Sequence, residues 1–222
     1  MYFVVPKGNI LSENNLSSKA YKVLEELIVT LKLEPGKTYS EKELMALSDI
    51  SRTPLREALL KLSSESLINI IPRRGIEISD INMSNQLSIL ETRKVLDNLL
   101  ISRATKYVTT TEKNKILEFK KYMQIAVEDK DVESFLKIDK QLDQFIFECA
   151  RNEYATNATA PLHIRSRRFW YYFKGLDDLE NCANVHMQLI DAIISSNEEK
   201  AVQISTEIID SLVAVVKKYI NI

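Results

Sequence analysis

Three side chains near the start of SRTPLREALLKL, residues 51–62, are of the types that contact DNA: Arg52, Thr53 and Arg56. Arginine hydrogen-bonds phosphates and guanine edges, and recognition helices place such residues in their N-terminal turns. An apolar stripe recurs at helical spacing on the other side: Leu55, Ala58, Leu59 and Leu62. The stretch therefore predicts a helix that lies in the major groove, although two arginines one turn apart also occur on ordinary solvated helices.

Two carboxylates, Asp139 and Asp143, form a second group of chemical interest because they lie one helical turn apart. If both are buried, they repel each other unless a cation lies between them. A divalent metal could supply that charge. So could an arginine, and the candidates are Arg93, Arg165, Arg167 and Arg168.

An aromatic run, residues 169–173, follows three of these arginines and could suggest nucleic-acid or ligand contact. Five consecutive aromatic residues cannot share one helix face, so we expect some in the core and others at a subunit interface rather than around a ligand. His163 is expected to be a packed or surface residue. For Arg93, an internal ion pair to Glu91 or Asp97 stands beside a role in anchoring an acidic ligand.

The elements before and after residues 51–62 predict a winged helix-turn-helix. Ser51 can cap the helix with its hydroxyl, and Pro54 is tolerated in the first turn. Ser40 and Glu43 form a capping box that opens a short helix. The expected order is helix 18–31, turn 34–37, helix 41–47, turn 48–50, helix 51–62 and a β-hairpin of strands 67–71 and 76–78 with a basic tip, Arg73-Arg74-Gly75.

After Asp80 the chain predicts an all-α bundle of about six helices, because one glycine and one proline leave little support for strands. Plausible N-caps are Thr111, Asp131 and Asn197. The expected helices are 84–107, 111–127, 131–150, 154–174, 179–195 and 198–220. The predicted organisation is a flexible arm (1–17), a winged helix-turn-helix (18–80) and a helical domain (81–222), a mainly α fold.

Composition is that of an ordinary globular protein: 222 residues, 45% hydrophobic and 27% charged, with a net charge of −1. Such a balance gives no bulk attraction to nucleic acid, so a DNA-binding surface must come from the placement of arginines. No apolar run approaches membrane-spanning length, and we expect no membrane partner. Cys149 and Cys182 lack metal-site or disulfide spacing, which favours reduced thiols in the cytoplasm.

The stretch SEKELMALSDISRTPLREALLKLSSESLINIIPRRGIEIS, residues 40–79, resembles the DNA-binding module of the GntR family of bacterial transcription regulators. The S-R-T-P-x-R-E-A-L core, the E-x-E-L start of the second helix and the R-G wing occur in the family's order. One departure is Ser66, where the family usually has glycine. The resemblance, together with the basic hairpin tip, implies DNA contacts by Lys42, Ser51, Arg52, Thr53, Arg56, Arg73, Arg74 and Gly75.

Three later segments resemble the FCD domain, the effector-binding part of FadR-like GntR regulators. They are ETRKVLDNLL (91–100), DKQLDQFIFECARNEY (139–154) and HMQLIDAI (186–193). The resemblance implies a small carboxylate effector, and the residues we expect around it are Arg93, Asp139, Asp143, Arg165 and His186.

Many FCD domains hold a divalent metal with one aspartate and three histidines. This chain keeps Asp139 and His186, but Asp143 and Ile208 occupy the positions of the other two ligands. Isoleucine cannot ligate. The resemblance therefore implies a degenerate site of Asp139, Asp143 and His186 that holds a cation weakly with water or an acid, or else a metal-free pocket.

We expect a homodimeric transcription regulator that reads an inverted repeat in double-stranded DNA and responds to a small organic acid. The first alternative is a metal-dependent enzyme using Asp139, Asp143 and His186, but no motif supplies the other groups such a reaction needs. The second is a structural DNA-binding protein without an effector, for which the helical domain is larger than dimerisation requires.

Overall fold

The computed structural model describes residues 16–173 and 178–220, and the chain divides into two compact units between Asp80 and Ile81. The predicted arm lies outside the described residues except for Leu16 and Ser17. These two residues begin helix α1 (Leu16–Val29), so the helix starts two residues earlier than expected.

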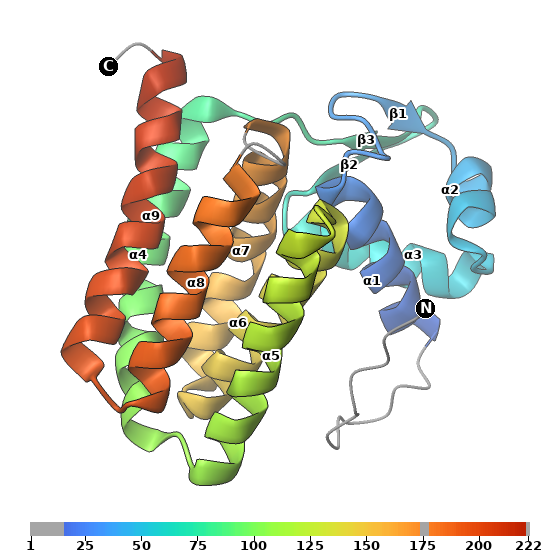
Figure 1. Ribbon diagram of the computed structural model, residues 1–222. Helices are drawn as coiled ribbons and strands as arrows, with labels where there is room; N and C mark the ends of the chain where they lie inside the picture. Colours follow the sequence, from blue (N-terminus) through green and yellow to red (C-terminus); the bar gives the residue numbers. More distant parts are fainter. Residues whose placement is uncertain (1–15, 174–177, 221–222) are drawn as a thin grey trace. The chain divides into compact units, whose positions relative to one another are not determined.

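The first unit is a winged helix-turn-helix (Figure 1). Helices α1, α2 (Glu41–Ser48) and α3 (Arg52–Ser64) pack with a three-stranded antiparallel sheet of order β1-β3-β2. The predicted stripe of α3 is confirmed, since Leu55, Ala58, Leu59 and Leu62 are all buried. The strands are β1 (Thr38–Tyr39), β2 (Ile68–Ile71) and β3 (Gly75–Ile78).

The hairpin β2–β3 is the predicted wing, and β1 is an addition that the sequence did not predict. Ile71 pairs with Gly75, which leaves Pro72, Arg73 and Arg74 in the turn. Strand β1 adds only two pairs to the outer edge of β3. Two residues are too few to produce an alternating hydrophobic pattern, so this strand has no sequence signature.

The helix caps explain where α2 and α3 begin. Ser40 and Glu43 form the predicted capping box, with the Ser40 N–H donating to Glu43 Oε2 at 2.7 Å. Ser51 occupies the N-cap position of α3, but its hydroxyl makes no cap hydrogen bond, so that expectation was wrong. The reason is Pro54: it stands three residues after the cap, where the usual N–H donor would be, and proline has none.

Ser66 takes the backbone conformation that makes glycine common at its position. Its φ is +56°, in the left-handed region. The chain therefore keeps the turn between α3 and β2 while using a side chain that is less suited to it. Serine in place of glycine therefore raises the free energy of this turn conformation but does not change its geometry.

The second unit is a bundle of six helices within the described residues, as expected, and each begins and ends within two residues of the prediction. Helix α4 packs against α9 and α7, α5 against α6 and α8, and α8 against α9 (Figure 1). The bounds are α4 (Met83–Tyr107), α5 (Thr110–Glu128), α6 (Val132–Cys149), α7 (Glu153–Phe173), α8 (Leu179–Ile194) and α9 (Glu198–Ile220).

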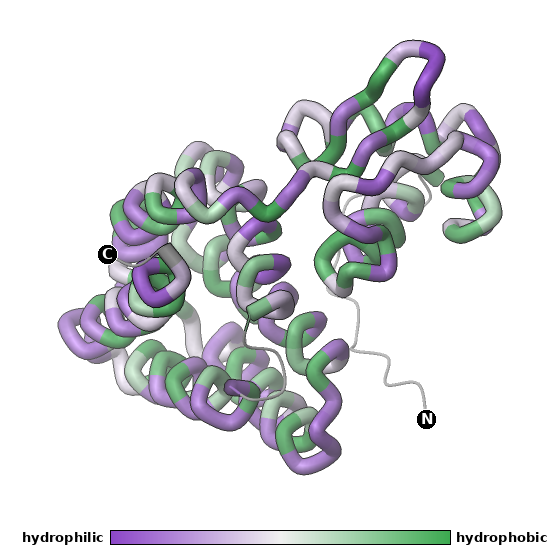
Figure 2. The backbone as a smooth tube through the Cα atoms, turned by 90° about the horizontal axis from the view of Figure 1, so that it is seen from above, coloured by the Kyte–Doolittle hydropathy of each residue, from purple (hydrophilic) through white to green (hydrophobic). Residues whose placement is uncertain are grey.

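The caps of these helices are partly as predicted. Asp131 accepts the N–H of Ser134, and Asn197 accepts the N–H of Lys200. Helix α5 is capped by Thr109 with Glu112, two residues before the expected Thr111. Hydrophilic and hydrophobic residues alternate along the bundle helices (Figure 2), and no helix in the described parts of the chain is long and apolar enough to span a membrane.

Candidate functional site

The N-terminal turn of α3 presents its polar side chains to solvent. Ser51, Arg52, Thr53 and Arg56 are exposed, and Lys42 on α2 is exposed as well. Because the apolar stripe of α3 is buried on the other side, these residues are held on one outward-facing end of the helix. This is the geometry of a recognition helix.

Glu41 joins the two arginines and was missed in the sequence. Its carboxylate accepts Arg56 Nε at 2.8 Å and lies 3.2 Å from Arg52 Nε. The hydrogen bond from Arg56 lowers the pKa of Glu41, with the charge of both arginines acting in the same direction. Glu41 is the first residue of α2, so its position on the helix-turn-helix was a signal that sequence reasoning could have used.

The wing tip needs its glycine. Gly75 has a φ of +124°, and a Cβ there would lie 2.6 Å from the backbone oxygen of Tyr39. Any side chain would push β1 away from β3. The arginines of the tip, Arg73 and Arg74, are both exposed, and Arg73 itself has a φ of +63°.

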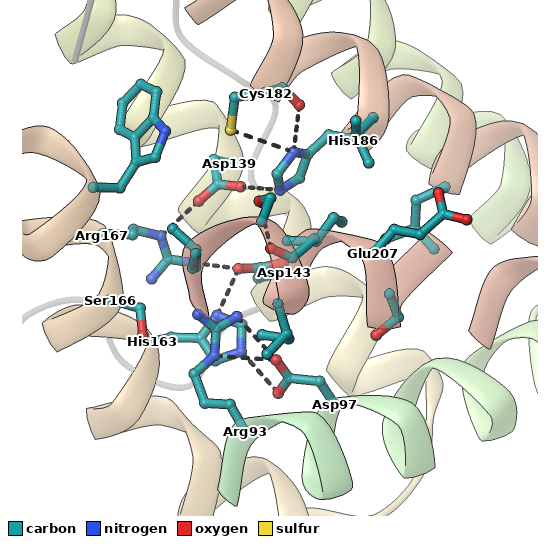
Figure 3. A pocket seen from close by; sticks show the side chains of 18 of the residues that line it. Arg93, Asp97, Asp139, Asp143, His163, Ser166, Arg167, Cys182, His186 and Glu207 are labelled. Carbon is teal, nitrogen blue, oxygen red and sulfur yellow. Dashed lines mark hydrogen bonds and ion pairs between the residues drawn. The ribbon is translucent and has the colours of Figure 1, made fainter. Parts of the chain in front are cut away.

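A cavity of about 160 Å³ lies inside the helical bundle, lined from α4, α6, α7, α8 and α9. Its walls are mostly apolar, and a group of buried charged side chains crosses it (Figure 3). Four of the five predicted effector residues line it: Arg93, Asp139, Asp143 and His186. Ile208, at the position of the missing histidine, lines it too.

Arg165 does not line this cavity, so its expected place there was wrong. Arg167, two residues further along α7, lines it instead. A shift of two residues turns a helical side chain through more than half a circle. The sequence did name Arg167 as a possible cation between the two aspartates, and the structure selects it.

The guanidinium of Arg167 lies between the two carboxylates of α6. Its Nε donates to Asp139 Oδ2 at 2.7 Å, and its Nη2 donates to Asp143 Oδ2. On the far side of Asp139, His186 Nε2 lies 3.0 Å from Oδ1. The predicted repulsion between the aspartates is therefore offset by a cation that belongs to the protein.

His163 is buried, one of its two expected environments, and it extends the same network toward α4, a role that the sequence did not predict. Its Nδ1 lies 2.8 Å from Asp143 Oδ2, and its Nε2 lies 2.9 Å from Asp97 Oδ1. Arg93 donates to the other oxygen of Asp97 from Nη2 at 2.9 Å. Arg93 thus has the internal ion pair considered from sequence, to Asp97 rather than Glu91, and it lines the cavity as well.

A spacing in the sequence could have revealed this network. His163 and Arg167 are four residues apart on α7, and Asp139 and Asp143 are four residues apart on α6. Residues at that spacing share a helix face. Two such pairs of opposite charge, on consecutive helices, predict a facing ladder of ion pairs.

The ion pairs shift the protonation of the buried groups. Burial alone would raise the pKa of Asp139, but Arg167 and His186 together hold it well below its usual range. Burial opposes the charged form of His186, yet its contacts with Cys182 and Asp139 raise its pKa well above the ordinary value. Asp97 resembles Asp139: His163 and Arg93 outweigh burial and lower its pKa.

Comparison with known families decides the class of protein. Residues 16–78 match the bacterial regulatory proteins of the gntR family, and residues 88–211 match the FCD domain. The chain belongs to the GntR family. It is a transcriptional regulator with a GntR helix-turn-helix and an FCD domain, as the motifs predicted.

Named relatives agree with this family. The HTH-type transcriptional repressor RspR of Escherichia coli K12 is 26% identical over 179 residues, covering 80% of this chain and 78% of its own. The gluconate operon transcriptional repressor of Bacillus licheniformis is 31% identical over 111 residues, 49% of this chain and 44% of its own. The solved structure of E. coli McbR/YncC has the same fold, with a TM-score of 0.81 at 19% identity over 95% of this chain and 99% of that one.

The donor set of this GntR regulator does not fit the metal that the resemblance implied. The space between Asp139 and Asp143 holds the Arg167 guanidinium, and the His186 Nδ1 lies 2.7 Å from the Cys182 carbonyl oxygen. The remaining imidazole nitrogen faces Asp139. Across residues 16–173 and 178–220, no group of three or more His, Cys, Asp or Glu side chains is arranged to hold a metal ion.

The aromatic run of α7 is divided between two environments. Phe169 is fully buried in the core, whereas Trp170 is buried and also lines the cavity. Tyr172 is exposed. The sequence favoured core and interface positions over ligand contact. Trp170 has both kinds of position, because it is buried in the core and also lines the cavity.

Proposed function

We propose that this GntR regulator is a cytoplasmic homodimeric repressor whose operator binding is controlled by a small molecule in the cavity of its FCD domain. The observation that carries the proposal is the cavity itself. Its mostly apolar walls and few buried polar groups are typical of ligand sites in proteins. The charged network gives such a site defined positions at which a ligand could be recognised.

The DNA-binding half of the proposal rests on the exposed end of α3. Two such helices in a dimer would read the two halves of an inverted repeat in adjacent major grooves. The wing arginines would contact phosphates, which position the protein without specifying sequence. Repression is proposed because RspR and the gluconate operon regulator are named repressors.

Control by a ligand needs only a modest difference in affinity. A ligand that binds the DNA-competent and DNA-incompetent forms with free energies differing by about 1–3 kcal/mol changes operator affinity several-fold or more. The resemblance implies a small organic acid as the ligand. The charges that line the cavity argue for a different class of ligand.

A metal-dependent enzyme, the alternative class, gains no support from the site. Asp139, Asp143 and His186 are the three donors it would use, and each is engaged by another protein side chain. The named relatives are regulators.

The test begins with the operator, selected from genomic fragments with the full-length protein. Arg52→Ala and Arg56→Ala should each weaken operator binding by about 1–3 kcal/mol, the range for an arginine that pairs with guanine. Lys19→Ala is the matched control, because Lys19 is an exposed cation on α1 of the same unit. Electrophoretic mobility shift measures all three, and an Arg52/Arg56 double variant that is folded yet binds like the wild type would refute the assignment.

A further inference from the structure

Ser166 carries an unusual hydroxyl at the wall of the cavity (Figure 3). The residue is 2% exposed, and its Oγ has no hydrogen-bond partner among the described residues. Leaving a buried hydroxyl unsatisfied costs about 1–3 kcal/mol. A bound molecule that hydrogen-bonds to Ser166 would recover that free energy, so the hydroxyl marks a contact point for a ligand.

The positive charges around the cavity are already matched. Arg93 pairs with Asp97, Arg167 with Asp139 and Asp143, and His163 and His186 each face a carboxylate. Two further carboxylates of the lining add no unmatched buried charge: Asp178 accepts a hydrogen bond from Trp170 Nε1 at 3.2 Å, and Glu207 is exposed to solvent and accepts one from Gln203.

An anionic ligand would therefore enter a site in which each arginine and histidine already faces a carboxylate of the protein. Burying a carboxylate without a matching cation is strongly unfavourable, and nearby like charges add to the cost. In a metal-holding FCD domain the metal can supply the missing positive charge. Here Arg167 occupies that place and its charge is consumed by the two aspartates.

The size and the walls of the cavity narrow the ligand further. An apolar cavity of about 150 Å³ holds a molecule of benzene. This cavity, about 160 Å³, is walled by Phe135, Phe147, Trp170, Leu189 and Leu212. A cavity of this volume with aromatic and branched walls suits a single ring or a short branched chain.

We infer that the effector of this regulator is an uncharged, ring-sized molecule with a polar group that hydrogen-bonds to Ser166, and that carboxylates are excluded. That the bound molecule acts as an effector rests on the proposed function, but its binding to the cavity can be tested without DNA. Because the arginines and histidines of the site are paired with its aspartates, no charge of these side chains is left to balance a charged ligand, and a neutral ligand is favoured.

The test uses two probes of nearly the same shape and different charge, benzamide and benzoate, with the full-length protein. Trp170 is the only tryptophan in the chain and lines the cavity, so its fluorescence reports binding. We expect benzamide to bind at least tenfold more tightly than benzoate. Equal or tighter binding of benzoate, or no binding of either probe at millimolar concentration, would overturn the inference.

Two serine variants locate the contact. Ser166→Ala should weaken benzamide binding about fivefold, which corresponds to a net hydrogen bond of about 1 kcal/mol. It should not lower the stability of the free protein, because the hydroxyl has no described partner to lose. Ser211→Ala is the control: Ser211 also lines the cavity, but its hydroxyl already donates to the Ile208 carbonyl at 2.8 Å.

If Ser166→Ala binds benzamide like the wild type, the assigned contact is wrong. These outcomes are separable from those of the proposed function. A loss of the neutral preference changes the class of ligand and leaves operator binding by α3 untouched, whereas failure of the arginine variants to affect operator binding leaves the cavity result standing.

Discussion

Arg167 supplies the positive charge between Asp139 and Asp143 that a bound cation supplies in a metal site, and it is a covalent part of the chain. Its guanidinium pairs with both aspartates of α6, and the side chain is about 10% exposed. Removing one member of a buried ion pair leaves an uncompensated charge and is strongly destabilising. The same pairing decides how the site responds to metals.

We predict that the purified protein carries no stoichiometric zinc. Asp143→His with Ile208→His restores the donor types of a one-aspartate, three-histidine site, but the double variant should still bind zinc poorly because Arg167 occupies the space between the donors. Adding Arg167→Ala should raise zinc affinity by at least tenfold. Elemental analysis and competition with a chelator measure this, and equal zinc affinity in the double and triple variants would contradict it.

His186 makes the stability of the helical domain depend on pH in the neutral to alkaline range. Its pKa is raised in the folded protein, so its contribution to stability is complete below the unfolded value of about 6.5 and is lost as pH rises above it. We predict that the wild type loses stability relative to His186→Gln between pH 6 and pH 9. Denaturant unfolding at both values measures the difference, and parallel pH profiles of the two proteins would show that His186 does not carry it.

At the scale of elements, the sequence predicted the helices and failed for the smallest strand. Every helix of the bundle was located within two residues because long helix-forming stretches with one glycine and one proline are separated by short segments that carry plausible N-caps. Strand β1 has two residues and exists only because β3 offers it an edge. The predicted cap hydrogen bond at Ser51 does not form because residue 54, three positions after the cap, is a proline and has no N–H to donate. The identity of the cap residue alone does not reveal this.

The site was predictable where one helix carries the pattern and unpredictable where two helices meet. Asp139, Asp143 and His186 were found from motifs. Ser166 had no signal, because a buried hydroxyl without a partner is a property of packing. Arg165 was chosen instead of Arg167 since the rotation of α7 about its axis depends on contacts with α4 and α6.

Two backbone positions in the wing region give opposite predictions for stability. Ser66→Gly should stabilise the winged helix by about 1 kcal/mol, because glycine adopts a positive φ without steric cost. Gly75→Ala should destabilise it by more than about 1 kcal/mol, because its Cβ meets the Tyr39 backbone. Denaturant unfolding of both variants decides, and effects of the same sign would show that the conformations are misassigned.

At the scale of the whole molecule, the two units have separate hydrophobic cores. Leu55 is fully buried in the first unit, and Leu142 is fully buried in the second. Each unit buries the apolar faces of its own helices and strands in its own core. Domains of this kind usually unfold as independent cooperative units.

We predict two thermal transitions that respond to different mutations. Leu55→Ala should lower the free energy of unfolding of the winged helix by about 2–5 kcal/mol, the cost of truncating a buried leucine, and Leu142→Ala should do the same for the bundle. Each variant should therefore lower the midpoint of one transition and leave the other in place. Differential scanning calorimetry of the full-length protein measures both. A single transition that both variants lower equally would mean that the units unfold as one.

The carboxylate of Glu41 has a consequence for how this regulator finds its target in a chromosome. An operator competes with about 10⁶–10⁹ other sites, most of which attract a protein through phosphate charge alone. Glu41 partly neutralises Arg52 and Arg56, and the chain as a whole has a net charge of −1. If Arg52 and Arg56 contact DNA as proposed, we expect random DNA to hold the protein weakly, and a sequence whose bases draw both arginines away from Glu41 to retain it. The molecule would then spend less time on the wrong DNA, and fewer copies would keep the operator occupied.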